Sequence, residues 1–118
     1  TKGRKIYGLK YEDEVEGIIC IAYTNDVPES IKELDMMSEL VHMKKEVPKV
    51  AIAYTVWSRK RGAGREIIQK VLSHAKEQGI ERVITLSPLT PMATHFHIRN
   101  GAKQISINDT SQNFEYEL

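Results

Sequence analysis

Apolar residues along this chain alternate between strand-like and helix-like spacing. The strongest strand signal is the β-rich run at residues 50–57. Behind it, apolar side chains recur at helical intervals over residues 67–75, and Gly79 suits the left-handed conformation that ends a helix. Residues 83–86 are again apolar, which predicts another short strand. A strand, a helix and a strand in this order predict a crossover connection within a mixed sheet.

A hairpin pattern precedes this unit. Residues 6–11 and 15–24 are rich in Ile, Val and Tyr, and a polar turn at residues 12–14 joins them, which predicts two antiparallel strands. The nearly continuous apolar run at residues 17–22 is typical of a strand that is covered on both faces. We therefore expect its side chains to be buried on both sides of the sheet.

Two further helices and two closing strands complete the pattern. Pro28 suits the first turn of a helix, and apolar residues at helical spacing extend to about Ser38, whereas residues 39–48 have no clear pattern. Thr90 and Pro91 suit the N-cap and the first position of a third helix of about nine residues. The closing strands are expected at residues 104–108 and 113–118.

Composition and element order together predict one domain over residues 1–118, of the α/β (α+β) class, with a mixed, mostly antiparallel central sheet and flanking helices. The net charge of +1 argues against a nucleic-acid or membrane-surface partner. No apolar run approaches the roughly 18 residues of a membrane-spanning helix. The single cysteine, Cys20, cannot form an internal disulfide, and no signal-peptide pattern is visible, so a cytoplasmic location is expected.

Candidate chemistry is concentrated at residues 54–65, YTVWSRKRGAGR, between the best strand and the best helix. A helix N-terminus presents unpaired N–H groups and a partial positive charge, so it can bind an anion. Gly62 and Gly64 allow a ligand to approach the backbone closely. Four cationic side chains in this loop favour a phosphate or diphosphate: Arg59, Lys60, Arg61 and Arg65. The alternative is a tight turn with solvated basic side chains, and the spacing is not that of a P-loop.

The segment at residues 59–64, Arg-Lys-Arg-Gly-Ala-Gly, resembles the R/Q-x-x-G-x-G/A signature of the GNAT superfamily of N-acetyltransferases. In that family the signature surrounds the diphosphate of acetyl-coenzyme A. Residues 96–102, FHIRNGA, stand where the family has a Phe/Leu-Tyr-x-x-x-Gly-Phe element. The resemblance extends from about residue 49 to the C-terminus, and more loosely back to residue 6. It implies a GNAT-like acyl-CoA N-acyltransferase fold in an abbreviated member that lacks the usual first strand and two helices.

The resemblance also implies acetyl-CoA as the co-substrate and assigns the residues that bind it. Backbone groups of Tyr54 and Val56 would pair with the pantetheine arm, and the side chains of Arg59 and Lys60 would add contacts. The diphosphate would lie against the consecutive amides of Arg61, Gly62, Ala63, Gly64 and Arg65. Tyr54 and Trp57 could line an acyl pocket, although aromatic strand residues are more often part of a core.

Two departures from the family bear on catalysis. The tyrosine that often protonates the departing thiolate is replaced by His97, and the asparagine often found at the start of that helix corresponds to Thr90. An unperturbed imidazole titrates near about 6.5, which makes His97 the candidate catalytic acid. The alternative for His97 is a partly buried helix residue with a satisfied hydrogen bond. His95 lies on another face of the helix, so no metal site is expected.

Two function classes follow. The first is an N-acetyltransferase that moves an acetyl group from acetyl-CoA to a small-molecule or peptide amine by direct attack. The second is a non-catalytic acyl-CoA-binding module of the same fold. A homodimer is also expected, because an abbreviated N-terminal region would expose an edge strand with Ile18, Ile19 and Ile21. The helix expected at residues 28–38 is the alternative cover for that surface.

Overall fold

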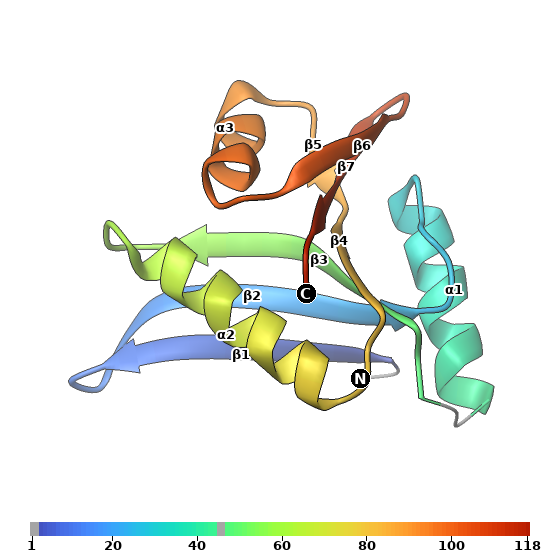
Figure 1. Ribbon diagram of the computed structural model, residues 1–118, viewed down its shortest axis with the longest axis horizontal. Coiled ribbons are helices and arrows are strands. Elements are labelled where there is room, and N and C mark those ends of the chain that lie inside the picture. The colour runs from blue at the N-terminus through green and yellow to red at the C-terminus, as the bar shows by residue number, and fades with distance from the viewer. Residues whose placement is uncertain (1–2, 45–46) are drawn as a thin grey trace.

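The computed structural model describes residues 3–44 and 47–118, which contain seven strands and three helices (Figure 1). The strands are β1 (Arg4–Tyr11), β2 (Glu14–Thr24), β3 (Val50–Ser58), β4 (Arg82–Thr85), β5 (Ser87–Pro88), β6 (Lys103–Ile107) and β7 (Ser111–Tyr116). The helices are α1 (Ile31–Lys44), α2 (Ala63–Glu77) and α3 (Pro91–Arg99).

The strands form one sheet in the order β1-β2-β3-β4-β7-β5, and β6 also pairs with β7. Within the described residues the β3–β4 pair is parallel and the remaining pairs are antiparallel. Helix α2 provides the crossover between the two parallel strands, as a parallel pair requires. The predicted α/β (α+β) class, with a mixed and mostly antiparallel sheet, is confirmed.

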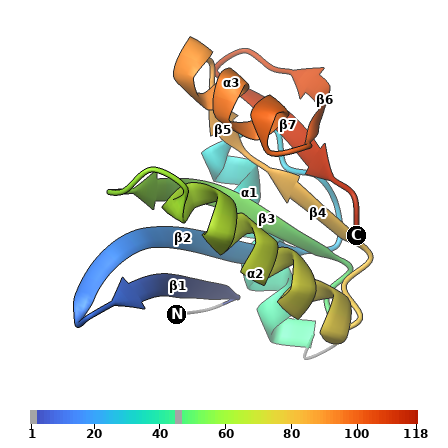
Figure 2. The same cartoon turned by 60° about the vertical axis from the view of Figure 1, so that its left-hand side comes forward.

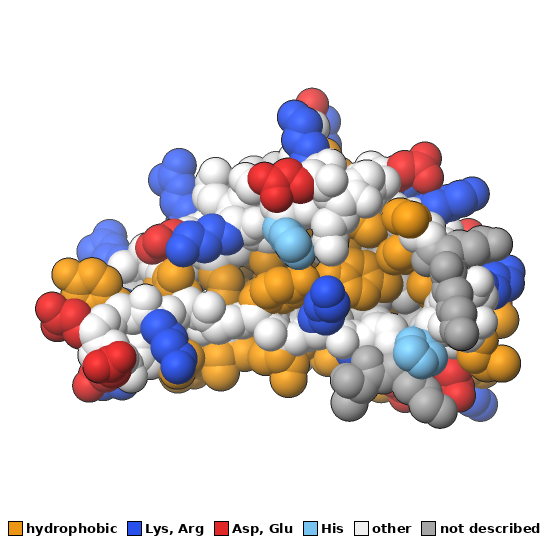
Figure 3. Space-filling view, turned by 90° about the horizontal axis from the view of Figure 1, so that it is seen from below, with side chains coloured by type: hydrophobic (Ala, Val, Ile, Leu, Met, Phe, Trp, Pro, Cys, Tyr) orange, Lys and Arg blue, Asp and Glu red, His pale blue; other side chains and the backbone are white. Residues whose placement is uncertain are grey.

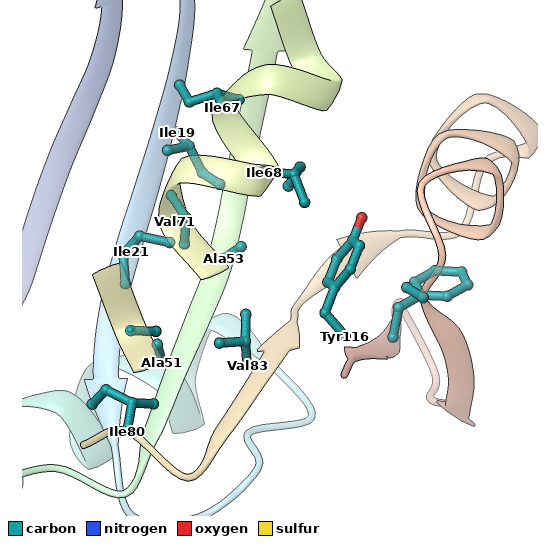
Figure 4. Close-up of a cluster of buried hydrophobic side chains, with 13 residues drawn as sticks. Ile19, Ile21, Ala51, Ala53, Ile67, Ile68, Val71, Ile80, Val83 and Tyr116 are labelled. Atoms are coloured by element: carbon teal, nitrogen blue, oxygen red, sulfur yellow. The ribbon is translucent and has the colours of Figure 1, made fainter. Parts of the chain in front are cut away.

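Helices cover the two faces of the sheet (Figures 1 and 2). On one face, Ile67 and Val71 of α2 pack against Ile19 and Ile21 of β2 (Figure 4). Leu34 of α1, which is 0% exposed, belongs to a second cluster on the opposite face. The other buried members of that cluster are Ala22, Val50, Ile52, Ile84 and Leu86. Successive strand residues therefore serve different clusters, as the alternation of side chains in a strand requires.

The apolar run of β2 is covered on both faces only toward its end. Ile19 and Ile21 are 0% and 1% exposed beneath α2, so the prediction that they form an exposed apolar surface is wrong. Ile18 and Cys20 point to the other face and are only half-buried, because α1 covers that face from Ala22 onward. The prediction of full cover on both faces is therefore wrong for the first half of the run.

Strand β1 is the outer strand of the sheet, and its Ile6 side chain is 72% exposed. An apolar cavity of about 220 Å³ lies between β1 and α2 and is lined in part by Tyr7, Leu9 and Val71. Figure 3, which views this side of the molecule, shows a band of apolar side chains with few charges inside it. Much of this edge strand is thus uncovered.

Helix α1 differs most from its predicted extent. It begins at Ile31, because the Ser30 hydroxyl accepts a hydrogen bond from the amide of Glu33 and caps the helix at 3.1 Å. It continues to Lys44 and so includes much of the segment that had no clear pattern; residues 45 and 46 of that segment lie outside the described part. No helix within the described residues is long and apolar enough to cross a membrane.

Helix α3 begins and ends as its sequence predicts. The Thr90 side chain accepts a hydrogen bond from the amide of Ala93, and a proline occupies the first turn. Gly101, at φ +99°, follows the end of the helix in a conformation that favours glycine. The last hairpin has a shorter turn than expected, since β7 begins at Ser111.

Candidate functional site

A groove opens where β3 and β4 separate. The two strands pair in parallel from Val50 to Ala53, and the last contact is the hydrogen bond from the amide of Leu86 to the carbonyl of Ala53 at 2.9 Å. Beyond this point β5 pairs with β7 instead, so the outer half of β3 loses its neighbour on that side (Figure 1). Side chains of β3, the β4–β5 segment and α3 line the resulting groove of about 490 Å³.

One extra residue in β3 determines which backbone groups face this groove. Tyr54 stands between Ala53 and Thr55, which pair with consecutive residues of β2. Ala53 and Val56 consequently pack against the same cluster beneath α2, although they are three residues apart. The amide of Arg59 donates a hydrogen bond to the carbonyl of Glu16 in β2 at 2.8 Å. Peptide groups alternate in direction along a strand, so those of residues at an odd number of positions before Arg59 point away from β2. The N–H and C=O of Val56 therefore face the open edge; their pairing with a pantetheine arm stays a prediction.

A basic pocket of about 380 Å³ continues the groove at the N-terminus of α2. Its lining residues are Ser58, Lys60, Arg61, Gly62, Gly64, Arg65, Phe96, Arg99 and Asn100. Ser58 and Phe96 line the groove as well, so the two concavities adjoin along these residues. The hydrogen bonds of the described residues engage the amides of Ala63 and Glu66 but not those of Gly64 and Arg65. The helix start thus presents N–H groups that are available to an anion.

The two glycines of the loop, Gly62 and Gly64, are needed for different structural reasons. Gly62 is the residue before α2 and has φ +89°, a conformation that other residues adopt only with strain. A Cβ atom on Gly62 would meet nothing within 4 Å, so the space beside it is open. A Cβ atom on Gly64 would lie 2.6 Å from Cε1 of Phe96. Gly64 therefore allows α2 and α3 to approach each other at the wall of the pocket.

The cations of the loop divide into two sets. Arg59 lies against Glu14 of β2 at 3.5 Å and does not line the pocket. Lys60 does line the pocket, and its Nζ is 3.3 Å from the buried Glu16 carboxylate. No salt bridge within the described residues involves Arg61 or Arg65. The pocket thus has cations that no carboxylate neutralises, as a phosphate site requires.

His97 lies on α3 between the groove and β7 and is 5% exposed. Its Nδ1 is 2.7 Å from the hydroxyl of Tyr116, and its ring contacts those of Phe96 and Phe114. Burial lowers the pKa of His97 from 6.5 to about 4, so the imidazole is neutral at pH 7. The expected role as an acid that titrates near neutral pH is unfavourable in this setting, whereas a hydrogen-bonding role is favourable.

Both aromatic residues of β3 line the groove, and Tyr54 also packs against the core cluster beneath α1. Trp57 is 47% exposed, so the interpretation that favoured a core position is wrong for this residue. The reason is that β3 extends past the end of α1 and past the point where β4 leaves it. Tyr54 also lines the groove, and the guanidinium of Arg4 lies 5.2 Å from its ring centre.

Residue-by-residue reasoning missed the contribution of α3 to the basic pocket. Phe96, Arg99 and Asn100 line it together, because they lie three and four positions apart on one face of the helix. A helical wheel of residues 91–100 would have shown this face, but nothing in the sequence shows that it meets the loop at residues 59–65.

Comparison with solved structures finds the same fold in proteins of the GNAT type. The loading GNATL domain of CurA from Lyngbya majuscula matches with a TM-score of 0.73 and 14% identity, over 98% of this chain and 76% of that one. The PaiA N-acetyltransferase of Thermoplasma acidophilum in complex with coenzyme A gives 0.69 and 11%, over 98% and 62%. A Bacillus subtilis acetyltransferase in complex with CoA gives 0.69 and 10%, over 98% and 78%.

These likenesses show the fold. The chain has the GNAT fold along nearly its whole length, and the resemblance read from residues 59–64 and 96–102 is confirmed at that level. The chain spans less than two thirds of the Thermoplasma acidophilum chain. No protein-family model matches the sequence, and no curated protein matches it.

Proposed function

We propose that the protein is an acetyl-CoA-dependent N-acyltransferase that transfers an acetyl group to an amine by direct attack. The observation that carries this proposal is that the groove beside β3 adjoins the basic pocket at the start of α2. Such a surface suits a ligand with an anionic diphosphate at one end and an acyl group on a narrow arm at the other.

The residues along this surface fit acetyl-CoA. The amides of Gly64 and Arg65, with the side chains of Arg61 and Arg99, offer donors and positive charge to a diphosphate. The outward-facing N–H and C=O of Val56 offer pairing partners to the amides of a pantetheine arm. When bound, acetyl-CoA supplies an acetyl group activated as a thioester. Two of the structures with the same fold hold coenzyme A.

The chain's own residues would act mainly by binding and orientation. Direct attack on a thioester needs a neutral amine held close to the acyl carbon, and orientation alone supplies a large part of such a rate enhancement. Trp57 and Met92, which line the groove and are exposed, would give the incoming amine an apolar border. The acceptor remains a small-molecule or peptide amine in this proposal, and the location remains cytoplasmic, where acetyl-CoA and a free thiol such as Cys20 are compatible.

The second candidate is a non-catalytic module that binds an acyl-CoA as a regulatory ligand. The buried and neutral His97 favours it, because this residue stands where the resembled family often has a tyrosine that acts as an acid. Both candidates require CoA binding, and only the first requires turnover.

Two measurements test the proposal. Titration of the protein with coenzyme A, followed by calorimetry, should show saturable binding that weakens with salt; no binding at millimolar coenzyme A would contradict both candidates. Incubation with acetyl-CoA and a panel of amines and peptides, followed by thiol release, then separates them. Release that depends on an acceptor supports the transferase, and binding without release on any acceptor supports the regulatory module.

A further inference from the structure

Tyr116 of β7 provides the one protein hydrogen bond to the imidazole of His97 in the described part of the chain. The Tyr116 hydroxyl is 2.7 Å from Nδ1 of His97, and the two rings meet edge to face at 5.8 Å between their centres. Tyr116 is 3% exposed and belongs to the cluster beneath α2 (Figure 4). Tyr116 therefore does not line the groove itself but contacts His97, which does.

The direction of this hydrogen bond follows from what each partner needs. If Nδ1–H donated to the Tyr116 oxygen, the hydroxyl hydrogen would need a second acceptor, and the described residues provide none. A buried donor without an acceptor destabilises the folded protein. If the hydroxyl donates to an unprotonated Nδ1, one hydrogen bond satisfies both groups. The hydroxyl is therefore the donor, and the single hydrogen of the neutral imidazole is on Nε2.

Nε2 of His97 is available to a ligand. Nε2 has no hydrogen-bond partner within residues 3–44 and 47–118. In the same residues, the one side-chain polar atom that is both fully enclosed and without a hydrogen bond is Oε2 of Glu16. Nε2 of His97 is therefore not fully enclosed. His97 lines the groove beside β3. The rings of Phe96 and Phe114, at 5.1 and 5.2 Å, restrict rotation of the imidazole. The N–H group is thus held in place at the wall of the groove.

We propose that Tyr116 is a positioning residue that holds His97 as the Nε2–H tautomer, so that this N–H donates a hydrogen bond to the carbonyl oxygen or the sulfur of a bound acyl thioester. The identity of that acceptor rests on the proposed function, whereas the tautomer does not. No proton is transferred in this arrangement: the imidazole stays neutral and stabilises negative charge that develops on the acceptor atom. The other tautomer would present a lone pair to the groove and would act as a base.

Nitrogen-15 NMR of the histidine rings in the free protein tests the tautomer without any ligand. At pH 7 the ring nitrogen of His97 that carries hydrogen should be Nε2, and a His97→Gln spectrum assigns its signals among the four histidines. An Nδ1–H tautomer in the wild-type protein would overturn the proposal, whatever the variants do.

Tyr116→Phe tests the cause. The variant retains the ring and removes the donor, so the Nε2–H preference should be lost while the remaining spectrum stays dispersed. Tyr23→Phe is the matched control, because its hydroxyl lies 3.1 Å from the hydroxyl of Tyr7 and not near His97. An unchanged tautomer in a folded Tyr116→Phe protein would show that Tyr116 does not set it.

Addition of acetyl-CoA then tests the acceptor separately. Saturating acetyl-CoA should shift the Nε2–H signal of His97 in the wild-type protein, and the shift should be reduced in Tyr116→Phe. If acetyl-CoA binds by calorimetry and leaves that signal unmoved, the hydrogen bond to the thioester is wrong and the proposed function stands. If acetyl-CoA does not bind at all, the proposed function fails, and with it the assigned acceptor.

Discussion

The basic pocket and the His97 centre adjoin at Phe96 and are built in different ways. The pocket takes most of its groups from one continuous segment, in which the end of β3, the loop and the first turn of α2 follow each other. The His97 centre joins α3 to β7, and its two hydrogen-bonded residues are 19 positions apart. The basic pocket depends mainly on one short segment of the chain, whereas the His97 centre forms only when α3 packs against the folded sheet.

This difference predicts which substitutions affect the two regions together. Backbone amides and exposed cations bind an anion with little help from distant residues. A buried imidazole, by contrast, has a pKa and a tautomer that its surroundings impose. Changes in the loop should therefore alter affinity, and changes around His97 should alter stability with pH. Phe96, which touches both regions, is the exception.

The largest expected effect is the acid sensitivity that His97 confers. Its folded pKa of about 4 lies below the unfolded value of 6.5, so the unfolded chain binds a proton first as the pH falls. The stability contributed by the neutral imidazole is complete above pH 6.5 and declines toward pH 4, by about 3 kcal/mol. Urea unfolding at several pH values should show this decline, and His97→Gln should flatten it.

His95→Gln is the matched control for that measurement, because His95 is exposed on the same helix. It should leave the decline in place. Equal slopes for His97→Gln and the wild-type protein would contradict the buried, neutral state of His97.

Gly64→Ala should disturb both regions at once. The new Cβ would lie 2.6 Å from Cε1 and 2.9 Å from Cζ of Phe96, so the ring must move along the wall shared by the pocket and the groove. Overpacking of this kind costs about 1–3 kcal/mol, and we expect about 2 kcal/mol together with weaker binding of coenzyme A. Thermal unfolding and calorimetry measure the two effects.

A second substitution sharpens this test. Gly64→Ala combined with Phe96→Leu should recover part of both losses, because the smaller side chain vacates the contact. Gly79→Ala is the control: its φ of +79° gives backbone strain in open space, away from either region. It should lower stability without changing affinity. No recovery in the double variant would mean that the Phe96 contact is not the cause.

Arg61→Ala or Arg65→Ala should weaken coenzyme A binding roughly tenfold, because a charge-assisted hydrogen bond is worth about 1.5–3 kcal/mol before solvent screening. Neither substitution should change the pH dependence of stability. The remaining affinity should depend less steeply on salt. Lys76→Ala, near the other end of α2, supplies a control with the same loss of charge. Equal losses for all three variants would indicate general electrostatic attraction rather than a site at the helix start.

The smallest effect is expected at β1, which belongs to neither region. We predict a dimer that pairs through this edge or through α1, with a mass near twice 13.5 kDa by light scattering. Ile6→Lys, at a side chain that is 72% exposed, should shift the protein toward the monomer without changing affinity or acid sensitivity. Ile31→Lys, at the start of α1, distinguishes the two surfaces. A mass of 13.5 kDa at every concentration would contradict the dimer.

Sequence reasoning reached the parts of this molecule that local chemistry determines. The caps of α3 follow from Thr90 and Pro91, and the position of the loop follows from Gly62 beside a periodic helix. The start of α1 could not be predicted as well, because a serine competes with a proline for the first turn and the choice depends on what each one contacts. Buried Asn113, for example, donates to the carbonyl of Pro28 at 3.0 Å and holds that residue outside the helix.

The candidate site divides in the same way. The loop residues were predicted from local charge, glycines and the family resemblance, whereas Arg99 and Tyr116 were not, because each becomes relevant only through a neighbour that is distant in sequence. The neutral state of His97 also depends on burial, which a helical pattern of nine residues does not show.

The extra residue at Tyr54 limits how evolution can remake this groove. Substitutions in β3 change the side chains beside a ligand, but they leave the direction of each peptide group as it is, because that direction depends on position in the strand. If Tyr54 paired regularly with Cys20 instead, every later residue of β3 would move by one position relative to β2, and the N–H and C=O of Val56 would point toward β2. A change of register, rather than a change of side chain, is therefore the event that would remove this ligand-binding edge.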